Sequence, residues 1–343
     1  MIWLTWRQFR VQAAAVYAAV AAVAVGLAIT GPRLVDLAQL DGSIYDKLTA
    51  TDQNLFMAGV IVVAVAPAII GAFWGAPMVA RELEAGTHRL AWNQSITRTR
   101  WLATKLAVTT LAAAVAVGAL TLAVSWWSDP IDGVQSSTRG SLPARITPVA
   151  FAMRGIAPVG YAVFAVVLGV TFGILIRRSL PAMALTLAVF TFVQIAVPMW
   201  VRPHLAPPVE KSITFSWDRL DGIRGDFGGS VSITLRTGER GAWVLSNETV
   251  DATGKATALP AWFGDCLPPP PSASNQGVAR VEVGSDNLES CFTRLNHEGY
   301  RQRVAYHPAS SFWRLQWTET ALFLTVSGLL AGLCFWWTRR RLS

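Results

Sequence analysis

Six long apolar runs set the strongest limit on what this chain can fold into. A transmembrane helix needs about 20 mostly apolar residues to cross roughly 30 Å of hydrocarbon. Runs of that length lie near residues 11–30, 55–79, 103–127, 155–176, 180–201 and 318–338. They lack the alternation of barrel strands, and in lipid the backbone must satisfy its own hydrogen bonds, so we expect six transmembrane helices.

The composition supports this assignment and also indicates a second, different region. Hydrophobic residues make up 52% of the chain and charged residues 15%, which is unusual for a soluble protein. Between the fifth and sixth runs, however, the composition is that of an ordinary soluble domain. We therefore predict an α-helical integral membrane protein with three parts: spans one to five over residues 1–201, a separate domain over 202–310, and the sixth span with a basic tail over 311–343.

The first run also has the basic start of a secretory signal, because Arg7 and Arg10 precede it. It has full span length, however, and no convincing small-residue cleavage pattern precedes the polar Leu34–Asp46 region. These features favour an uncleaved first span.

Lysine and arginine indicate the side of each loop, because they concentrate on the cytoplasmic side of a membrane. With both termini inside, the cytoplasmic segments carry twelve Lys and Arg, and the opposite short loops carry five. This distribution predicts a multi-pass plasma-membrane protein with both termini in the cytoplasm. Residues 202–310 hold eleven basic and twelve acidic residues, so the net charge of +8 comes from the membrane flanks and does not indicate a nucleic-acid-binding surface.

In this topology, residues 202–310 form a small β-rich extracytoplasmic domain between spans five and six. Val231–Leu235 alternates like a strand, RTGERG supplies a turn, and AWVLSNETV (242–250) is the expected partner strand. Residues 279–284 and 301–307 are expected as further strands.

The three cysteines divide between the two regions. Cys266 and Cys291 fall in the expected outer domain, where a disulfide persists, and Cys334 falls in the sixth span. A disulfide between Cys266 and Cys291 would close a loop of about 25 residues and contribute about 3 kcal/mol by restricting the unfolded chain. Two buried thiols are the alternative.

No sequence motif indicates an enzyme. The phosphate-binding string GxxxxGK[ST] is absent, as are GxSxG, HExxH and a CxxC pair, and the four histidines lack the spacing of metal ligands. Proton-coupled transporters keep ionisable residues inside their spans, whereas we expect Lys105 and Glu319 at span ends. The sequence therefore disfavours an enzyme, a secondary transporter and a channel, and any transport must draw its energy from another chain.

A polar segment, RELEAGTHRLAWNQSITRTRW (Arg81–Trp101), separates the second and third runs on the cytoplasmic side. Apolar positions recur in it at helical spacing, so we expect a short helix over Arg81–Trp92. A polar loop lying on lipid headgroups is the alternative. Glu82 and Glu84 are the only acidic residues of the cytoplasmic side, and they favour a protein partner.

The segment ARELEAGTHRLAWNQSITRTRWLATK resembles the cytoplasmic coupling loop of type-2 ABC exporter permeases. Two further segments, residues 154–190 and 306–320, resemble the actinobacterial branch of that family. The resemblance implies a coupling loop at residues 80–102, in which the ATPase-coupling residues are Glu82, Glu84, Gly86, Thr87, Leu90 and Trp92. It also implies that span three is anchored at its entry by Arg98, Trp101 and Lys105.

The resemblance implies a permease subunit that works as a dimer with a second copy or a paralogue. A separate ABC ATPase subunit would bind ATP and Mg, and this chain would bind no cofactor or metal and export an apolar or amphiphilic cargo. The opening segment MIWLTWRQFR would lie along the inner membrane surface with Ile2, Trp6 and Phe9 toward lipid. The alternative function is a membrane-anchored receptor or scaffold whose outer domain binds a ligand.

Overall fold

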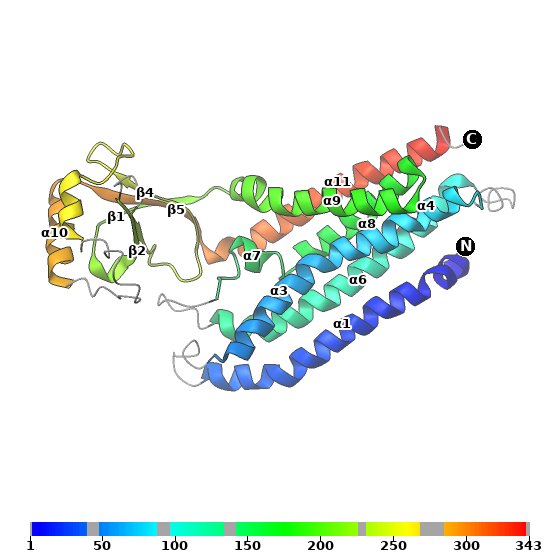
Figure 1. Cartoon of the computed structure of the whole chain (residues 1–343), viewed down its shortest axis with the longest axis horizontal. Helices are drawn as coiled ribbons and strands as arrows, with labels where there is room; N and C mark the ends of the chain where they lie inside the picture. Colours follow the sequence, from blue (N-terminus) through cyan, green and yellow to red (C-terminus); the bar gives the residue numbers. More distant parts are fainter. Residues whose placement is uncertain are drawn as a thin grey trace, which may run out of the picture. The chain divides into compact units, whose positions relative to one another are not determined.

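The structure is a computed structural model that describes residues 2–39, 48–87, 97–133, 142–225, 231–267 and 285–340. It divides into two compact units, Met1–Ala206 with Ser310–Ser343, and Pro207–Ala309. The first unit holds the long helices and the second holds two small sheets (Figure 1). Within the described residues, six helices are long and apolar enough to cross a membrane, as the six apolar runs predict.

The first unit is a bundle of long helices (Figure 1). It begins with α1 (Ile2–Gln39), which is followed by a second span in three pieces. The other elements of this unit, in chain order, are α3 (Ala50–Ile70), the π-helical η1 (Gly71–Gly75), α4 (Ala76–Glu84), α6 (Arg98–Gly133), α7 (Pro148–Phe151), α8 (Ala157–Ile176), α9 (Ser179–Ala196), η2 (Val197–Val201), η3 (Arg202–His204) and α11 (Phe312–Arg340).

The central helix of this unit is α8. It is apolar on every face, and 72% of its most apolar stretch is buried, which is the largest share among the six candidate spans. It packs against α4, α6, α9 and α11. Because a helix that is apolar all round must be covered on all sides, α8 forms the buried centre of the unit, whereas α1 packs mainly on α6.

Two pairs of glycines bring α8 close to the second span. Gly71 and Gly75 of η1 face α8, and Gly169 and Gly173 of α8 face η1 and α4. A Cβ atom at Gly75 would lie only 2.5 Å from the backbone oxygen of Val166. The small residues therefore serve close helix packing within the chain, as they commonly do between membrane helices.

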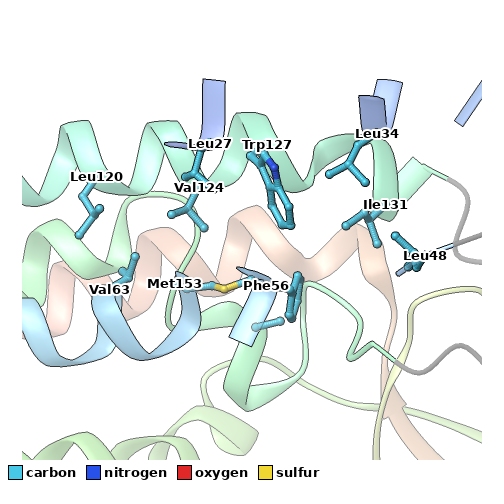
Figure 2. Close-up of a cluster of buried hydrophobic side chains, with 11 residues drawn as sticks. Leu27, Leu34, Leu48, Phe56, Val63, Leu120, Val124, Trp127, Ile131 and Met153 are labelled. Atoms are coloured by element: carbon cyan, nitrogen blue, oxygen red, sulfur yellow. The ribbon is translucent and has the colours of Figure 1, made fainter. Parts of the chain in front are cut away.

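A hydrophobic cluster joins α1, α3 and α6 (Figure 2). Its buried members are Leu27, Leu34, Leu48, Phe56, Val63, Leu120, Val124, Trp127, Ile131, Ala150 and Met153. Figure 2 shows the side chains of α6 pointing toward Phe56 and Met153. The indole nitrogen of Trp127 also donates a hydrogen bond of 2.9 Å to Thr30 Oγ1 of α1. In lipid, such packing and interhelical hydrogen bonds hold helices together.

The expectation that Phe9 faces lipid is wrong. The ring of Phe9 is buried against Trp74, edge to face, with the ring centroids 4.5 Å apart. Phe9 shares with Ala13, one turn later, the face of α1 that packs on the second span. Trp6 is exposed, as expected, and the side chain of Ile2 lies outside the described part of the structure.

The second unit contains two antiparallel sheets. The three-stranded sheet has the order β1 (Val209–Ile213), β5 (Arg301–His307), β4 (Trp243–Val250), and the two-stranded sheet pairs β2 (Leu220–Gly225) with β3 (Val231–Leu235). The strands expected at Val231–Leu235, in 242–250 and at 301–307 are present. The expected strand at 279–284 lies outside the described residues.

The pairing predicted between the strands now named β3 and β4 is wrong. The backbone of β4 bonds to β5, and that of β3 bonds to β2. The two sheets are joined instead by side chains: Gln302 donates to the backbone oxygen of Ile233 at 2.8 Å, and Asn247 donates to that of Leu235 at 2.9 Å. Alternation marks a strand but does not identify its partner, because every half-buried strand alternates.

Helix α10 (Ser285–His297), which the sequence analysis did not predict, completes the core of the second unit. Phe292 of α10 stacks on Phe215 and Phe263. A disulfide joins Cys291 of α10 to Cys266 in the short helix η5 (Ala261–Cys266). A small unit gains stability from such a crosslink because the bond restricts its unfolded chain.

Candidate functional site

The predicted coupling loop, residues 80–102, begins within α4, which ends at Glu84. Gly86 has φ of +69°, a left-handed conformation that ends a helix and that favours glycine, because a side chain at this φ is strained. The helix predicted over Arg81–Trp92 therefore stops at Glu84 and does not continue through Thr87, and residues 88–92 lie outside the described residues. Thr87 is exposed, whereas Leu90 and Trp92 fall in that outside stretch.

Glu82 is bound to two residues of α6. One carboxylate oxygen lies 2.6 Å from Lys105 Nζ, and the other accepts a hydrogen bond of 3.2 Å from the indole nitrogen of Trp101. Lys105 Nζ also donates to the backbone oxygen of Met78 at 3.2 Å and lies over the ring of Trp101. These contacts tie the last turn of α4 to the first turns of α6.

Trp101 and Lys105, which we expected to anchor the entry of span three, are both buried inside the bundle. Trp101 packs in a hydrophobic cluster with Val79 and Ile174, and Lys105 is only 4% exposed. A charge in such a place needs a partner, since an isolated buried ion is costly. Glu82 supplies that partner, and this explains why an acidic residue stands among the basic residues of this segment.

Glu84 binds the start of α9. Its Oε2 accepts hydrogen bonds from the backbone nitrogen of Ser179 at 3.2 Å and from Ser179 Oγ at 2.9 Å. A carboxylate is favourable at a helix N-terminus because free backbone N–H groups and the helix dipole both face it. Glu84 is exposed, so this contact is open to solvent and to a partner.

The other end of the loop begins α6. Thr97 precedes the helix, and its Oγ1 accepts a hydrogen bond of 3.3 Å from the backbone nitrogen of Arg100. Arg98 is the first residue of α6. Both ends of the loop therefore emerge from the same end of the bundle, with Glu82 joined to Lys105 across the gap.

A second polar centre, which the sequence analysis missed, lies at the other end of α9. The guanidinium of Arg202 binds both carboxylate oxygens of Glu319 in α11, at 2.7 and 2.9 Å. Tyr161 of α8 donates its hydroxyl hydrogen to Glu319 Oε1 at 2.5 Å. Arg202 also donates to the backbone oxygen of Pro148 and lies 4.2 Å from the ring centroid of Phe151.

Both members of this ion pair are completely buried within the bundle, and this burial was not foreseen from the sequence. The sequence contained one usable signal: a single Arg ends the fifth run and a single Glu begins the sixth, with opposite charges on the same predicted side. Two lone opposite charges at neighbouring span ends favour a pair.

Gln316, one turn before Glu319, extends this centre. Its side-chain oxygen accepts from the backbone nitrogen of Ala157 at 2.7 Å, and its nitrogen donates to the backbone oxygen of Arg154 at 2.9 Å. Arg154 in turn forms an ion pair with Asp132 of α6. These bonds fix the start of α11 to the start of α8 and to the segment just before α8.

Comparison with known families gives the first unit its identity. A family model described as ABC-2 membrane transporter related matches residues 11–202, more than half of the 343-residue chain. The chain belongs to this family. No curated protein and no solved structure matches it.

Membership confirms the ABC-2 part of the resemblance seen in the sequence. It makes this ABC-2 protein a multi-pass membrane protein and an ABC transporter permease, a kind of transport subunit that pairs with an ABC ATPase subunit. The actinobacterial branch and the export direction stay predictions. Among the residues that the structure describes, no group of three or more His, Cys, Asp or Glu side chains is arranged to hold a metal ion.

Proposed function

We propose that this ABC-2 protein is the permease subunit of an ATP-driven exporter that moves an apolar or amphiphilic cargo. A separate ABC ATPase subunit would bind ATP and Mg and would dock on the loop at residues 80–102. The observation that carries the proposal is the bracing of α4 at this loop: Glu82 is held by α6, and Glu84 is held by α9.

The braces supply a route from the ATPase to the spans. A force on the loop reaches α4 first, and the contacts of Glu82 and Glu84 pass it to α6 and α9. Rigid helices then move together relative to a second copy of the chain or a paralogue, as in other rigid-body switches. ATP binding shifts the equilibrium between the two helix arrangements only by as much as the affinity for ATP differs between them.

The proposed topology places the loop and both termini in the cytoplasm and residues 202–310 outside, in the plasma membrane. Twelve basic residues on the loop side against five on the other support this orientation. The Cys266–Cys291 disulfide supports an oxidising compartment for the second unit. Single cysteines at Ser343 and at Thr253 would test it: a membrane-impermeant maleimide should label only the Thr253→Cys variant in intact cells.

The direct test of the function is copurification. The tagged full-length protein is extracted from its own membranes in a mild detergent, and copurifying chains are identified by mass spectrometry. We expect a P-loop ATPase subunit in stoichiometric amount, with ATP hydrolysis in the complex. The proposal fails when no such ATPase accompanies the protein under several gentle conditions while an unrelated ABC permease, treated in parallel, retains its own.

A second candidate function is a receptor or scaffold whose outer domain binds a ligand. The observation that favours this function is that the second unit has its own core, around Phe215, Phe263 and Phe292, and its own disulfide. The same copurification separates the two functions, because a receptor has no need of a stoichiometric ATPase.

A further inference from the structure

Two hollows follow one another along the crevice between α1 and the second span. The first has a volume of about 400 Å³ and an entirely apolar lining, including Ala15, Ala19 and Val23 of α1 and Ile61, Val65 and Ile69 of α3. Several of these side chains are exposed on the outer surface of the bundle, so the hollow is a groove open to the surrounding membrane.

The second hollow, of about 280 Å³, is polar. It is lined by Gln12 of α1, by Trp74 of η1, by Arg81 and Glu82 of α4, and by Lys105 of α6. Gln12 is one helical turn before Ala15, and Trp74 is one turn beyond Ile70, a further residue of the apolar lining. The two hollows therefore lie end to end, and together they form what we call the α1–α3 crevice.

The polar end of the crevice carries one excess positive charge. Lys105 and Glu82 neutralise each other, with their charged atoms 2.6 Å apart. The guanidinium of Arg81 is exposed and has no hydrogen-bond or ion-pair partner among the described residues. An anionic group in this hollow would therefore meet an arginine whose five N–H donors suit phosphate oxygens.

The dimensions fit a lipid. From Ala15 to Val23 the apolar groove rises about 12 Å along α1, close to the roughly 15 Å depth of one leaflet's hydrocarbon. The polar hollow follows at the level where a headgroup would lie. A packed helix of a partner protein would be about 10 Å across and would have no use for the arginine at the end of an otherwise apolar groove.

We propose that the α1–α3 crevice is a binding site for a membrane lipid with an anionic phosphate headgroup, one acyl chain lying in the apolar groove and the phosphate at Arg81. The polar end of the site shares Arg81 and Glu82 with the segment 80–102 on which the ATPase would dock, but lipid binding itself needs no ATPase. Its failure in the test below would therefore leave the proposed function standing, and the reverse also holds.

The test is photolabelling of the full-length protein in lipid nanodiscs. Phosphatidic acid and phosphatidylcholine, each with the same diazirine-bearing acyl chain, are compared, and the labelled peptides are mapped. We expect phosphatidic acid to label residues 15–23 and 61–70 in preference to other lipid-facing helices. Arg81→Gln should lower the ratio of anionic to zwitterionic labelling about fivefold, the effect of one arginine at a membrane surface.

Two matched controls sharpen this test. Arg100→Gln removes an exposed arginine from the start of α6 and should leave the ratio unchanged. Ala19→Phe should fill the groove and lower labelling by both probes, whereas Ala21→Phe, an exposed alanine outside the lining, should not. Equal labelling by the two lipids, or a ratio that Arg81→Gln does not change, would show only annular lipid and overturn the proposal. So would disulfide-linked dimers of an Ala19→Cys variant in the same nanodiscs, because they would place a second copy in the groove.

Discussion

Charged side chains at the two ends of α9 are buried to different degrees. At the end where α9 begins, Glu84 is exposed and Glu82 keeps 17% of its side-chain surface accessible, although its partner Lys105 is buried. Where α9 has ended, Arg202 and Glu319 are 1% and 0% exposed and share a third partner, Tyr161. A sealed pair holds a structure in one arrangement, whereas a partly open pair can respond to a neighbouring protein. This difference fits a fixed centre at one end and a coupling site at the other.

We expect the largest loss of folding stability when one member of the buried Arg202–Glu319 pair is removed. Glu319→Gln leaves the Arg202 guanidinium buried without its counter-ion, and we expect a loss of about 3–5 kcal/mol of folding stability. Adding Arg202→Met should recover much of that loss, because no uncompensated charge then remains. Thermal unfolding of the detergent-solubilised protein, followed by size-exclusion chromatography, measures both. A single variant as stable as the double variant would contradict a sealed ion pair.

The second largest loss of stability is expected where α8 crosses the second span at close range. Gly169→Ala puts a methyl group against the backbone of Gly71, and we expect a loss of about 1–3 kcal/mol from overpacking. Gly328→Ala is the matched control, since no atom lies within 4 Å of the position of its new Cβ. It should be neutral or slightly stabilising, because alanine is the better helix former. Equal unfolding temperatures for the two variants would show that the helices do not depend on this close approach.

Mutation of the partly exposed Glu82–Lys105 pair should destabilise the protein less than mutation of the buried Arg202–Glu319 pair. Lys105→Met removes the ammonium that binds Glu82 and the backbone of Met78, and we expect a loss of about 1–3 kcal/mol. Glu82 can then turn to solvent, which a buried Glu319 cannot do. In a double-mutant cycle with Glu82→Gln, the two losses should be non-additive. Additive losses would mean that the ion pair does not contribute as a pair.

The smallest effect is expected in the second unit, at an exposed turn. The side chain of Thr253 and the backbone N–H of Lys255 donate hydrogen bonds to Asp251 and hold the pKa of its carboxyl below the usual value. The folded pKa is lower than the unfolded one, so this stabilisation is present above about pH 4 and is lost as the pH falls through the folded pKa. Amide exchange at 253–255 should show more opening at pH 3, corrected for intrinsic rate, and Asp251→Asn should remove that pH dependence. Protection that is equally pH-dependent in Asp251→Asn would assign the effect to another group.

The six spans could be predicted from sequence because each is a local property, a run of about 20 apolar residues. The polar contacts could not, because their members are far apart in the chain. Arg202 and Glu319 are separated by 117 residues, and Glu84 and Ser179 by 95. No local pattern shows which charges will meet, so the ion pairs of Lys105 with Glu82 and of Arg202 with Glu319 were not predicted.

The local structure of the candidate site was only partly predicted from the sequence. The two acidic residues drew attention to the segment, but its apolar spacing suggested a helix that runs beyond Glu84, whereas α4 ends there and Gly86 is left-handed. The prediction of strand pairing was wrong because the partner of β4 is distant in the sequence: β4 bonds to β5, about 50 residues later, and not to its neighbour β3.

The central claim is that Glu82 and Glu84 hold the coupling loop in the arrangement to which an ATPase docks. The most direct measurement is the amount of ATPase that copurifies with the double variant Glu82→Gln, Glu84→Gln, compared with Glu248→Gln, which removes an exposed, ion-paired carboxylate from the second unit. The account predicts that the double variant reaches the membrane folded and loses most of the ATPase, while Glu248→Gln keeps it. A folded double variant that retains the ATPase and full ATP-driven transport would contradict it.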